Sequence, residues 1–344
     1  MNAPEKAEVL SEGETPVVTG AEQTALPAQE GAAAVTGKKK SKFVSRLKRY
    51  RYLYLLMIPG FAWYLCFHIM PLYGIVIAFQ DYTVSSTSIW GNEWVGWGNF
   101  EILFSSPDFL MVFRNTVWIS FWKLVCGFFA PIVLALMING LTCRPYKKVV
   151  QTISYLPNFL SWVIIFALSF ILFNDYTGVF HNLFEALGLP YRDPTANVDT
   201  IIPFLVLSAV WKGVGMSSII YLAALSGIDP QLYEAARVDG ASKFRQLRSI
   251  TIPSLLPICA IVLILNAGSL MSGDFEQVLL FQRTNNPLMV EKTEIFETYL
   301  YRTGIQNFRY SISAALGLFQ SFFGSILILT VNFIAKKLGY DGIW

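Results

Sequence analysis

Six long apolar segments dominate the pattern of hydrophobic and polar positions along the chain. Each carries few charges and holds the roughly 20 residues that a helix needs to cross the hydrocarbon of a bilayer. The segments span residues 53–79, 110–141, 151–174, 200–226, 254–273 and 311–335. Because only helices or closed barrels satisfy the backbone inside lipid, this pattern predicts an all-α polytopic membrane protein with six transmembrane helices.

Polar residues and prolines interrupt several of these segments. In the fifth, Asn266, Gly268 and Ser269 break the apolar run before its end. Proline removes a backbone donor and bends a helix, so kinks are expected wherever neighbouring helices can satisfy the freed groups. The prolines inside the segments are Pro59, Pro71, Pro131, Pro157, Pro203 and Pro257.

The overall composition agrees with a membrane protein. The 344 residues are 54% hydrophobic and 14% charged, against about 25% charged in an average soluble domain. The four cysteines (Cys66, Cys126, Cys143 and Cys259) show no CxxC spacing, so small apolar filler is favoured over a metal or disulfide role.

The amino-terminal region differs in composition from the rest of the chain. Residues 1–37 are rich in Ala, Glu, Pro, Gly and Thr, which predicts a disordered tail and not a secretory signal. Eight basic residues and no acidic one follow in 38–51, which favours an anchor for anionic headgroups over a nucleic-acid patch. We therefore expect a tail over 1–51 and a membrane domain over 52–344.

The distribution of Lys and Arg between the loops predicts the orientation. With the amino terminus inside, the cytoplasmic segments hold 17 basic residues and the three outer loops hold five. This bias follows the positive-inside rule, so both termini are expected in the cytoplasm.

One cytoplasmic stretch, 233–253, concentrates six ionisable side chains between the fourth and fifth segments. Asp229 can cap a helix that has Pro230 at its first position, and Asp239-Gly240 then interrupts it. Leu232, Ala236, Ala241, Phe244 and Leu247 can share one face of this element. The alternatives are a solvated loop and a docking element that presents a ridge to a partner.

The same stretch resembles the EAA motif of ABC importer permeases. It reads Glu234-Ala235-Ala236, then Gly240, then Ile250-Thr251-Ile252-Pro253, with Ile252 where the family has Leu. VGWGNF (95–100) and RNT (114–116) are similar to carbohydrate permeases of the maltose-importer type. Four further stretches resemble the polysaccharide and oligosaccharide branch: YLPNFLSWVI (155–164), GDFEQVLLF (273–281), TYLYRTGI (298–305) and YSISAALGLFQS (310–321).

This resemblance implies a type I importer permease fold with a cytoplasmic coupling helix in the loop 227–253. Glu234 would pair with a basic residue of an ATPase subunit, Ala235 and Ala236 would form the contact surface, and Gly240 would make the bend. Ile250, Ile252 and Pro253 would set the exit into the fifth helix.

The implied complex contains this chain, a second homologous permease, two ATPase subunits and an extracytoplasmic binding protein. A homodimer of this chain stays open as an alternative to the heterodimer. The implied location is a bacterial plasma membrane. The implied cargo is an oligosaccharide, with uronate-containing sugars as one class and another polar solute as the alternative. The resemblance assigns no cofactor to this chain, and ATP and Mg²⁺ would be bound by the ATPase subunits.

An enzymatic function is disfavoured. The chain contains no GxxxxGK[ST] loop for ATP phosphates, and its two histidines, His68 and His181, cannot build a credible catalytic set. A secondary transporter is a further alternative, but neither inverted repeats nor membrane-buried carboxylates for ion coupling are evident.

Six residues within the segments are candidates for the transport pathway. Ionisable groups at mid-membrane are costly and often functional, which singles out Lys123 and Lys212. The other candidates are Trp211, Asn266, Ser269 and Gln320, which could contact sugar rings or hydroxyls. Internal pairing, polar contacts between helices and ordinary packing are the structural alternatives. Asp274 and Glu276, at the outer end of the fifth segment, could belong to a gate or to the exposed interface.

Overall fold

The computed structural model of the protein describes residues 49–282 and 286–339. The expected tail over 1–37 and most of the basic cluster after it lie outside the described residues. The described chain is helical apart from one isolated β-bridge between Gln80 and Trp94. The chain divides into two compact units, Met1–Tyr64 and Leu65–Trp344.

The described part of the first unit is a single helix, α2 (Arg51–Tyr64), with Pro59 inside it. All its side chains are exposed, although most are large and apolar. Such a helix is stable only where lipid or another chain covers it. Together with the helical residues that follow, α2 forms an apolar stretch, Arg51–Phe79, long enough to cross a membrane.

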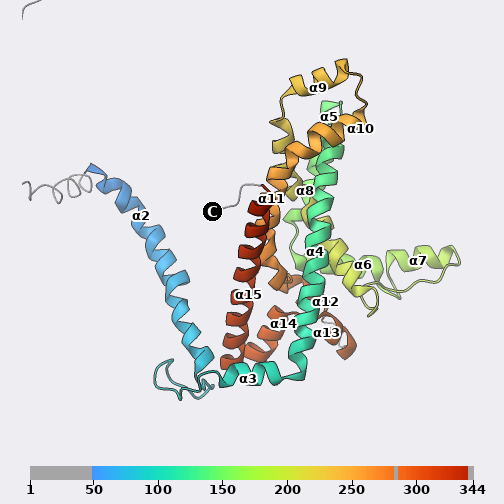
Figure 1. The fold of residues 1–344 in the computed structure, drawn as a ribbon. Helices are drawn as coiled ribbons and strands as arrows, with labels where there is room; N and C mark the ends of the chain where they lie inside the picture. The colour runs from blue at the N-terminus through green and yellow to red at the C-terminus, as the bar shows by residue number, and fades with distance from the viewer. Residues whose placement is uncertain (1–48, 283–285, 340–344) are drawn as a thin grey trace, which may run out of the picture. The chain divides into compact units, whose positions relative to one another are not determined.

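The second unit contains all the other described helices, which are coloured along the chain in Figure 1. They are η1 (Leu65–Ile69), η2 (Met70–Phe79), α3 (Gly98–Ser105), α4 (Pro107–Asn139), α5 (Arg144–Tyr155), η3 (Leu156–Phe159), α6 (Trp162–Phe173), α7 (Val179–Ala186), α8 (Ile201–Ser226), α9 (Pro230–Val238), α10 (Lys243–Gln246), η4 (Leu247–Thr251), α11 (Ile252–Ala267), η5 (Gly268–Met271), α12 (Phe275–Phe281), α13 (Pro287–Thr293), α14 (Phe296–Leu300), η6 (Tyr301–Gln306) and α15 (Tyr310–Lys337).

The helices α4, α8, α11 and α15 form the bundle at the centre of this unit. A buried cluster that includes Tyr221 and Leu255 joins α4, α8 and α11 near the α9 end. A second cluster, which includes Leu103, Phe296 and Leu316, joins α3, α4, α14 and α15 at the opposite end. A third cluster, which includes Ile119, Leu205 and Val278, joins α4, α8 and α12.

Five of the six expected spans are single helical stretches of suitable length and hydropathy: Arg51–Phe79, Pro107–Asn139, Ile201–Ser226, Lys243–Met271 and Tyr310–Lys337. The fifth is longer than expected because α10 and η4 run directly into α11. Its last residues form the tighter helix η5, where the sequence places Gly268 and Ser269.

The third expected span, 151–174, is broken close to Pro157, where the sequence predicts a kink. The chain bends by 103° between Arg144–Phe159 and Trp162–Phe173. Pro157 ends α5, and Ser161 restarts the helix as the cap of α6 by accepting a hydrogen bond from the Ile164 amide at 3.3 Å. As a result α6 and α7 project sideways from the bundle (Figure 1).

Candidate coupling surface and transport pathway

The tip of the bundle is built by α9, at the end where α5 and α10 also lie (Figure 1). Asp229 caps α9 by accepting a hydrogen bond from the Gln231 amide at 2.9 Å, and Pro230 occupies the first turn. The helix ends at Val238, and Gly240 reverses the chain with φ +72°, a conformation that favours glycine. The cap, the helix and the bend are therefore confirmed as the sequence predicts them.

Two side-chain contacts fix this tip to the bundle. The Tyr233 hydroxyl lies 3.0 Å from the Thr251 hydroxyl at the start of α11. The Gln246 side chain donates to the Ala241 carbonyl at 2.9 Å, across the turn after Gly240. The turn therefore connects α9 to α11 through directed contacts, so a displacement of α9 can move the long helix.

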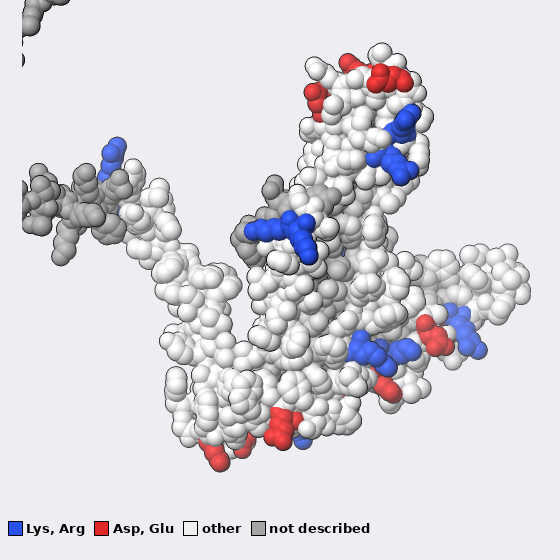
Figure 2. Space-filling view, viewed as in Figure 1, with Lys and Arg blue, Asp and Glu red and all other residues white. Residues whose placement is uncertain are grey.

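The surface of the tip is largely uncovered. No residue of α9 is buried, and Leu232, Val238 and Phe244 expose 50, 89 and 72% of their surfaces. Figure 2 shows acidic side chains at the tip and basic ones below them. Glu234 has no ion-pair partner among the described residues. This mixed surface of exposed apolar and charged groups is typical of an interaction site.

A cavity of about 480 Å³ lies between α4, α8 and α11, closed at one end by residues 272–274. Gly127 and Gly213 form part of its wall, and a Cβ added at either position would meet no atom within 4 Å. These glycines therefore widen the cavity and are not needed for helix contact. Polar groups from Ser120, Asn266 and Ser269 also line it.

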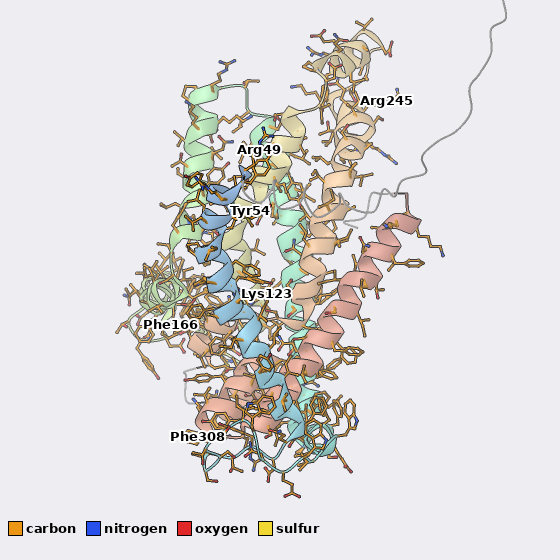
Figure 3. All side chains as sticks on the ribbon, turned by 90° about the vertical axis from the view of Figure 1, so that its left-hand side faces the viewer. Arg49, Tyr54, Lys123, Phe166, Arg245 and Phe308 are labelled. Atoms are coloured by element: carbon orange, nitrogen blue, oxygen red, sulfur yellow. The ribbon has the colours of Figure 1, made fainter. Side chains whose placement is uncertain are left out.

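Lys123 is the cation of this cavity, at the middle of α4 (Figure 3). Its ammonium donates to the Gly273 carbonyl at 2.7 Å and to the side-chain oxygen of Gln277. The nearest carboxylate oxygen of Asp274 lies 3.8 Å away. Only 13% of the Lys123 side chain is exposed, so these partners replace most of its water.

A short strap, which we define as residues 271–274, crosses the end of the cavity between η5 and α12. Its carbonyl groups accept hydrogen bonds from Gln320, Ser120 and Lys123 at 2.7–3.0 Å. On its other side, Glu297 accepts hydrogen bonds from the Ser272 hydroxyl at 2.6 Å and the Gly273 amide at 3.0 Å. Side chains from three helices therefore position this backbone.

Lys212 lies apart from the cavity-lining residues. Its ammonium donates to the carbonyls of Leu160 and Asn158 at 2.7 and 3.1 Å, and it lies 5.6 Å from the centre of the Trp162 ring. Both carbonyls belong to the bend between η3 and α6, where the helical hydrogen bonds are interrupted. Lys212 therefore supplies the donors that this bend lacks.

The structure brings together only part of the predicted pathway set. Lys123, Asn266 and Ser269 line the cavity, and Gln320 contacts the strap from outside it. Trp211 lines a separate apolar groove between α6 and α8 and exposes 48% of its surface. Whether any of these residues touches cargo stays a prediction.

Sequence reasoning missed Gln277, which is fully buried on α12. Its amide nitrogen donates to the Leu205 carbonyl and the Ser208 hydroxyl of α8 at 2.8 and 2.9 Å, while its oxygen accepts from Lys123. Gln277 thus links α4, α8 and α12. The signal in the sequence was a polar residue directly before the apolar run VLLF (278–281).

A second polar group missed by sequence reasoning joins α4 to the segment before α14. The Arg302 guanidinium donates to Glu294 at 2.7 Å and lies 3.7 Å from Asp108. Glu294 is 2% exposed, and its burial raises its pKa to about 7 against the opposing effect of Arg302. This carboxyl group therefore titrates near neutral pH.

The described residues contain no group of three or more His, Cys, Asp or Glu side chains that could hold a metal ion. The chemistry available at the cavity is therefore that of one ammonium, one carboxylate, and several hydroxyl, amide and carbonyl groups. Such groups suit the binding of a polar solute.

Comparisons with known proteins match both the membrane domain and the fold. The family described as "Binding-protein-dependent transport system inner membrane component" matches residues 124–339. Protein LplB of Bacillus subtilis (strain 168) is 38% identical over 319 residues, which cover 93% of this chain and 99% of LplB. The polygalacturonan/rhamnogalacturonan transport system permease protein YteP of the same organism is 39% identical over 307 residues, covering 89% and 94% of the two chains.

A solved structure shows the same arrangement of helices. One chain of a bacterial alginate ABC transporter, crystallised with an alginate pentasaccharide-bound periplasmic protein, has a TM-score of 0.79 and 34% sequence identity. The similarity covers 87% of this chain and 99% of that chain. The helix arrangement described above is therefore the fold of an ABC importer permease.

Proposed function

This chain belongs to the family of binding-protein-dependent transport system inner membrane components, and we propose that it forms the pathway by which an ABC importer takes up acidic oligosaccharides. It is an integral inner-membrane permease, not an ATPase. The single observation that carries the proposal for the cargo is the placement of Lys123 in the wall of a glycine-lined cavity at mid-bundle.

The chemistry of the relatives' cargo supports this choice. YteP is named for polygalacturonan and rhamnogalacturonan, and the alginate transporter imports an acidic polysaccharide. Both kinds of sugar present carboxylates beside many hydroxyl groups. A single ammonium among hydroxyl, amide and carbonyl groups complements such a ligand, because a charge-assisted hydrogen bond adds to ordinary sugar contacts.

The exposed tip supports the proposed coupling role. Glu234 would pair with a basic residue of an ATPase subunit, and Ala235 and Ala236 would permit a close backbone approach. Gly240 would set the angle of α9, while Ile250, Ile252 and Pro253 would lead the motion into α11. With the tip in the cytoplasm, both termini of the chain lie there as well.

The proposed assembly contains a second homologous permease, two ATPase subunits that bind ATP and Mg²⁺, and an extracytoplasmic solute-binding protein. The exposed apolar side chains along the bundle leave room for both lipid and the second permease. The binding protein would deliver the sugar to the end of the bundle opposite α9.

The test is to co-purify the complex and measure ATP hydrolysis in proteoliposomes against a panel of neutral and uronate-containing oligosaccharides. Oligogalacturonate and alginate oligosaccharides should stimulate hydrolysis, and neutral oligosaccharides of equal length should stimulate it less. Stimulation by neutral sugars alone would overturn the assignment of acidic cargo. Uptake by this chain in the absence of an ATPase would overturn the importer itself.

A further inference from the structure

Lys123 keeps hydrogen-bonding capacity directed at the cavity. An ammonium group has three donors, and two of them are used by the Gly273 carbonyl and the Gln277 side chain. Asp274 stands 3.8 Å away, which is an ion pair but lies beyond hydrogen-bond distance. Within the described residues, the third donor therefore has no close acceptor.

Asp274 holds its place less firmly than the other partners of Lys123. Its side chain is 47% exposed and lines the cavity, and no hydrogen bond from the described residues fixes its carboxylate. Its backbone has φ +71° and ψ +70°, a left-handed conformation that side chains other than Gly, Asn and Asp rarely adopt. The carboxylate that faces Lys123 thus belongs to a left-handed residue at the end of the strap.

The strap connects this residue to the rest of the bundle. Gln320, Ser120 and Glu297 hold its backbone from three sides, and a Cβ on Gly273 would approach Ile295 to within 2.6 Å. The strap therefore moves only as a unit, together with η5 or α12. Lys123 attaches the strap to the cavity wall twice, by its hydrogen bond to the Gly273 carbonyl and by its ion pair with Asp274.

We propose that Lys123 is the specificity-determining residue for acidic sugars, and that it exchanges Asp274 for a carboxylate of the cargo. The inference rests on the function proposed above and deepens it. A sugar carboxylate supplies the same acceptor chemistry as Asp274, and it reaches the third donor from the cavity. When it binds, it replaces the Lys123–Asp274 ion pair, so arrival of the cargo removes one of the contacts between the strap and the cavity wall. A neutral sugar cannot replace Asp274, since a hydroxyl group brings no charge.

This exchange predicts that replacing Lys123 and replacing Asp274 change the KM for acidic sugars in opposite directions. Lys123→Met removes the group that binds the sugar carboxylate, while Asp274→Asn removes its competitor. A purely structural ion pair gives another result, because loss of either partner then destabilises the same contact. Measured together, the two variants therefore distinguish binding of the cargo carboxylate from a purely structural ion pair.

The experiment measures uptake of oligogalacturonate into proteoliposomes by the complete complex with saturating binding protein. Lys123→Met should raise the KM by about 10- to 100-fold, the usual effect of one charge-assisted hydrogen bond, and Lys123→Arg should recover part of it. Asp274→Asn should lower the KM with little change in the maximal rate. Glu276→Gln, two residues along and without an ion pair to Lys123, should match the wild type.

Thermal unfolding of each purified complex checks that the variants fold. If Lys123→Met is poorly folded, Asp274→Asn still decides, because an increase in its KM overturns the exchange. A parallel loss of uptake in both variants, or a Lys123→Met complex equal to the wild type, overturns it too. A wild-type complex that takes up neither oligogalacturonate nor alginate oligosaccharides overturns the proposed function, and the exchange with it.

Discussion

At the scale of single residues, the two mid-membrane lysines have different surroundings although their sequence contexts are alike. Lys123 faces a cavity and a carboxylate, whereas Lys212 donates to two backbone carbonyls at a broken helix. Each satisfies its charge in a different way, as intramembrane ionisable groups must. The environment of each lysine suggests a separate role: binding for Lys123 and support of the bend for Lys212.

Replacing Lys212 with Met should destabilise the protein by about 1–3 kcal/mol, because two partly buried carbonyls lose their donor. Thermal unfolding in detergent measures the loss. Trp211→Phe is the control, since the neighbouring side chain lines an apolar groove and makes no such contact. A Lys212→Met protein of normal stability that fails only in uptake would instead favour a role in the pathway.

The buried carboxyl of Glu294 predicts a dependence of stability on pH. Its pKa rises from 4.5 to about 7 on folding, so the folded state binds the proton more tightly. This contribution to stability is fully present below pH 4.5 and is lost as the pH rises through 7. The unfolding temperature should therefore fall more between pH 5 and pH 8 in the wild type than in Glu294→Gln. Equal slopes would contradict the raised pKa.

At the scale of elements, α9 shows how a few local signals determine a short helix. Asp229 and Pro230 start it, and Gly240 ends its run with a left-handed turn. The α9 side chains bury little surface, so the capping residues and the turn at Gly240 determine this helix without a hydrophobic core. Its stiffness then depends on the Tyr233–Thr251 contact and on the geometry at Gly240.

Gly240→Val should impair coupling without preventing membrane insertion. A side chain at φ +72° costs about 1–2 kcal/mol, and the space around Gly240 is open, so the effect acts through the backbone. The rate of ATP hydrolysis should no longer match the rate of sugar uptake. Glu234→Lys should show the same loss of coupling, because the charge of its side chain is reversed.

Gly240→Asn is the matched control, because Asn tolerates this backbone conformation. It should retain more coupling than Gly240→Val. Normal sugar-stimulated hydrolysis and uptake in both Gly240→Val and Glu234→Lys would count against α9 as the coupling helix.

At the scale of the whole molecule, the bundle keeps a cavity between α4, α8 and α11 beside tightly packed helix contacts. Two glycines of α8 illustrate the difference. Gly213 faces the cavity, where a Cβ would meet no atom, whereas a Cβ on Gly215 would overlap the Ser154 carbonyl of α5. One face of the same helix therefore serves the cavity, and the other permits close contact with a neighbour.

These glycines provide a matched pair of variants. Gly213→Phe should fill part of the cavity, reducing uptake strongly while leaving the unfolding temperature near that of the wild type. Gly215→Ala should destabilise the protein by about 1–3 kcal/mol through overpacking. Uptake assays and thermal unfolding of both variants give the comparison. Normal uptake by Gly213→Phe would show that cargo passes elsewhere.

The sequence by itself determined the elements whose signals are local. Apolar length determined the membrane spans, because crossing lipid requires a fixed run of residues, and capping residues determined α9 with its bend. The EAA spacing indicated the permease family to which the chain belongs.

Only the tertiary structure decided which polar residues meet. Lys123 and Asp274 are far apart in the chain, as are Gln277 and Ser208, and their contacts depend on how α4, α8 and α12 pack. The 103° bend likewise needs Lys212 to satisfy its carbonyls from another helix. Such long-range pairing leaves no periodic trace in one sequence, which is why Lys123, Asn266 and Ser269 could be proposed for a pathway while their contacts could not be predicted.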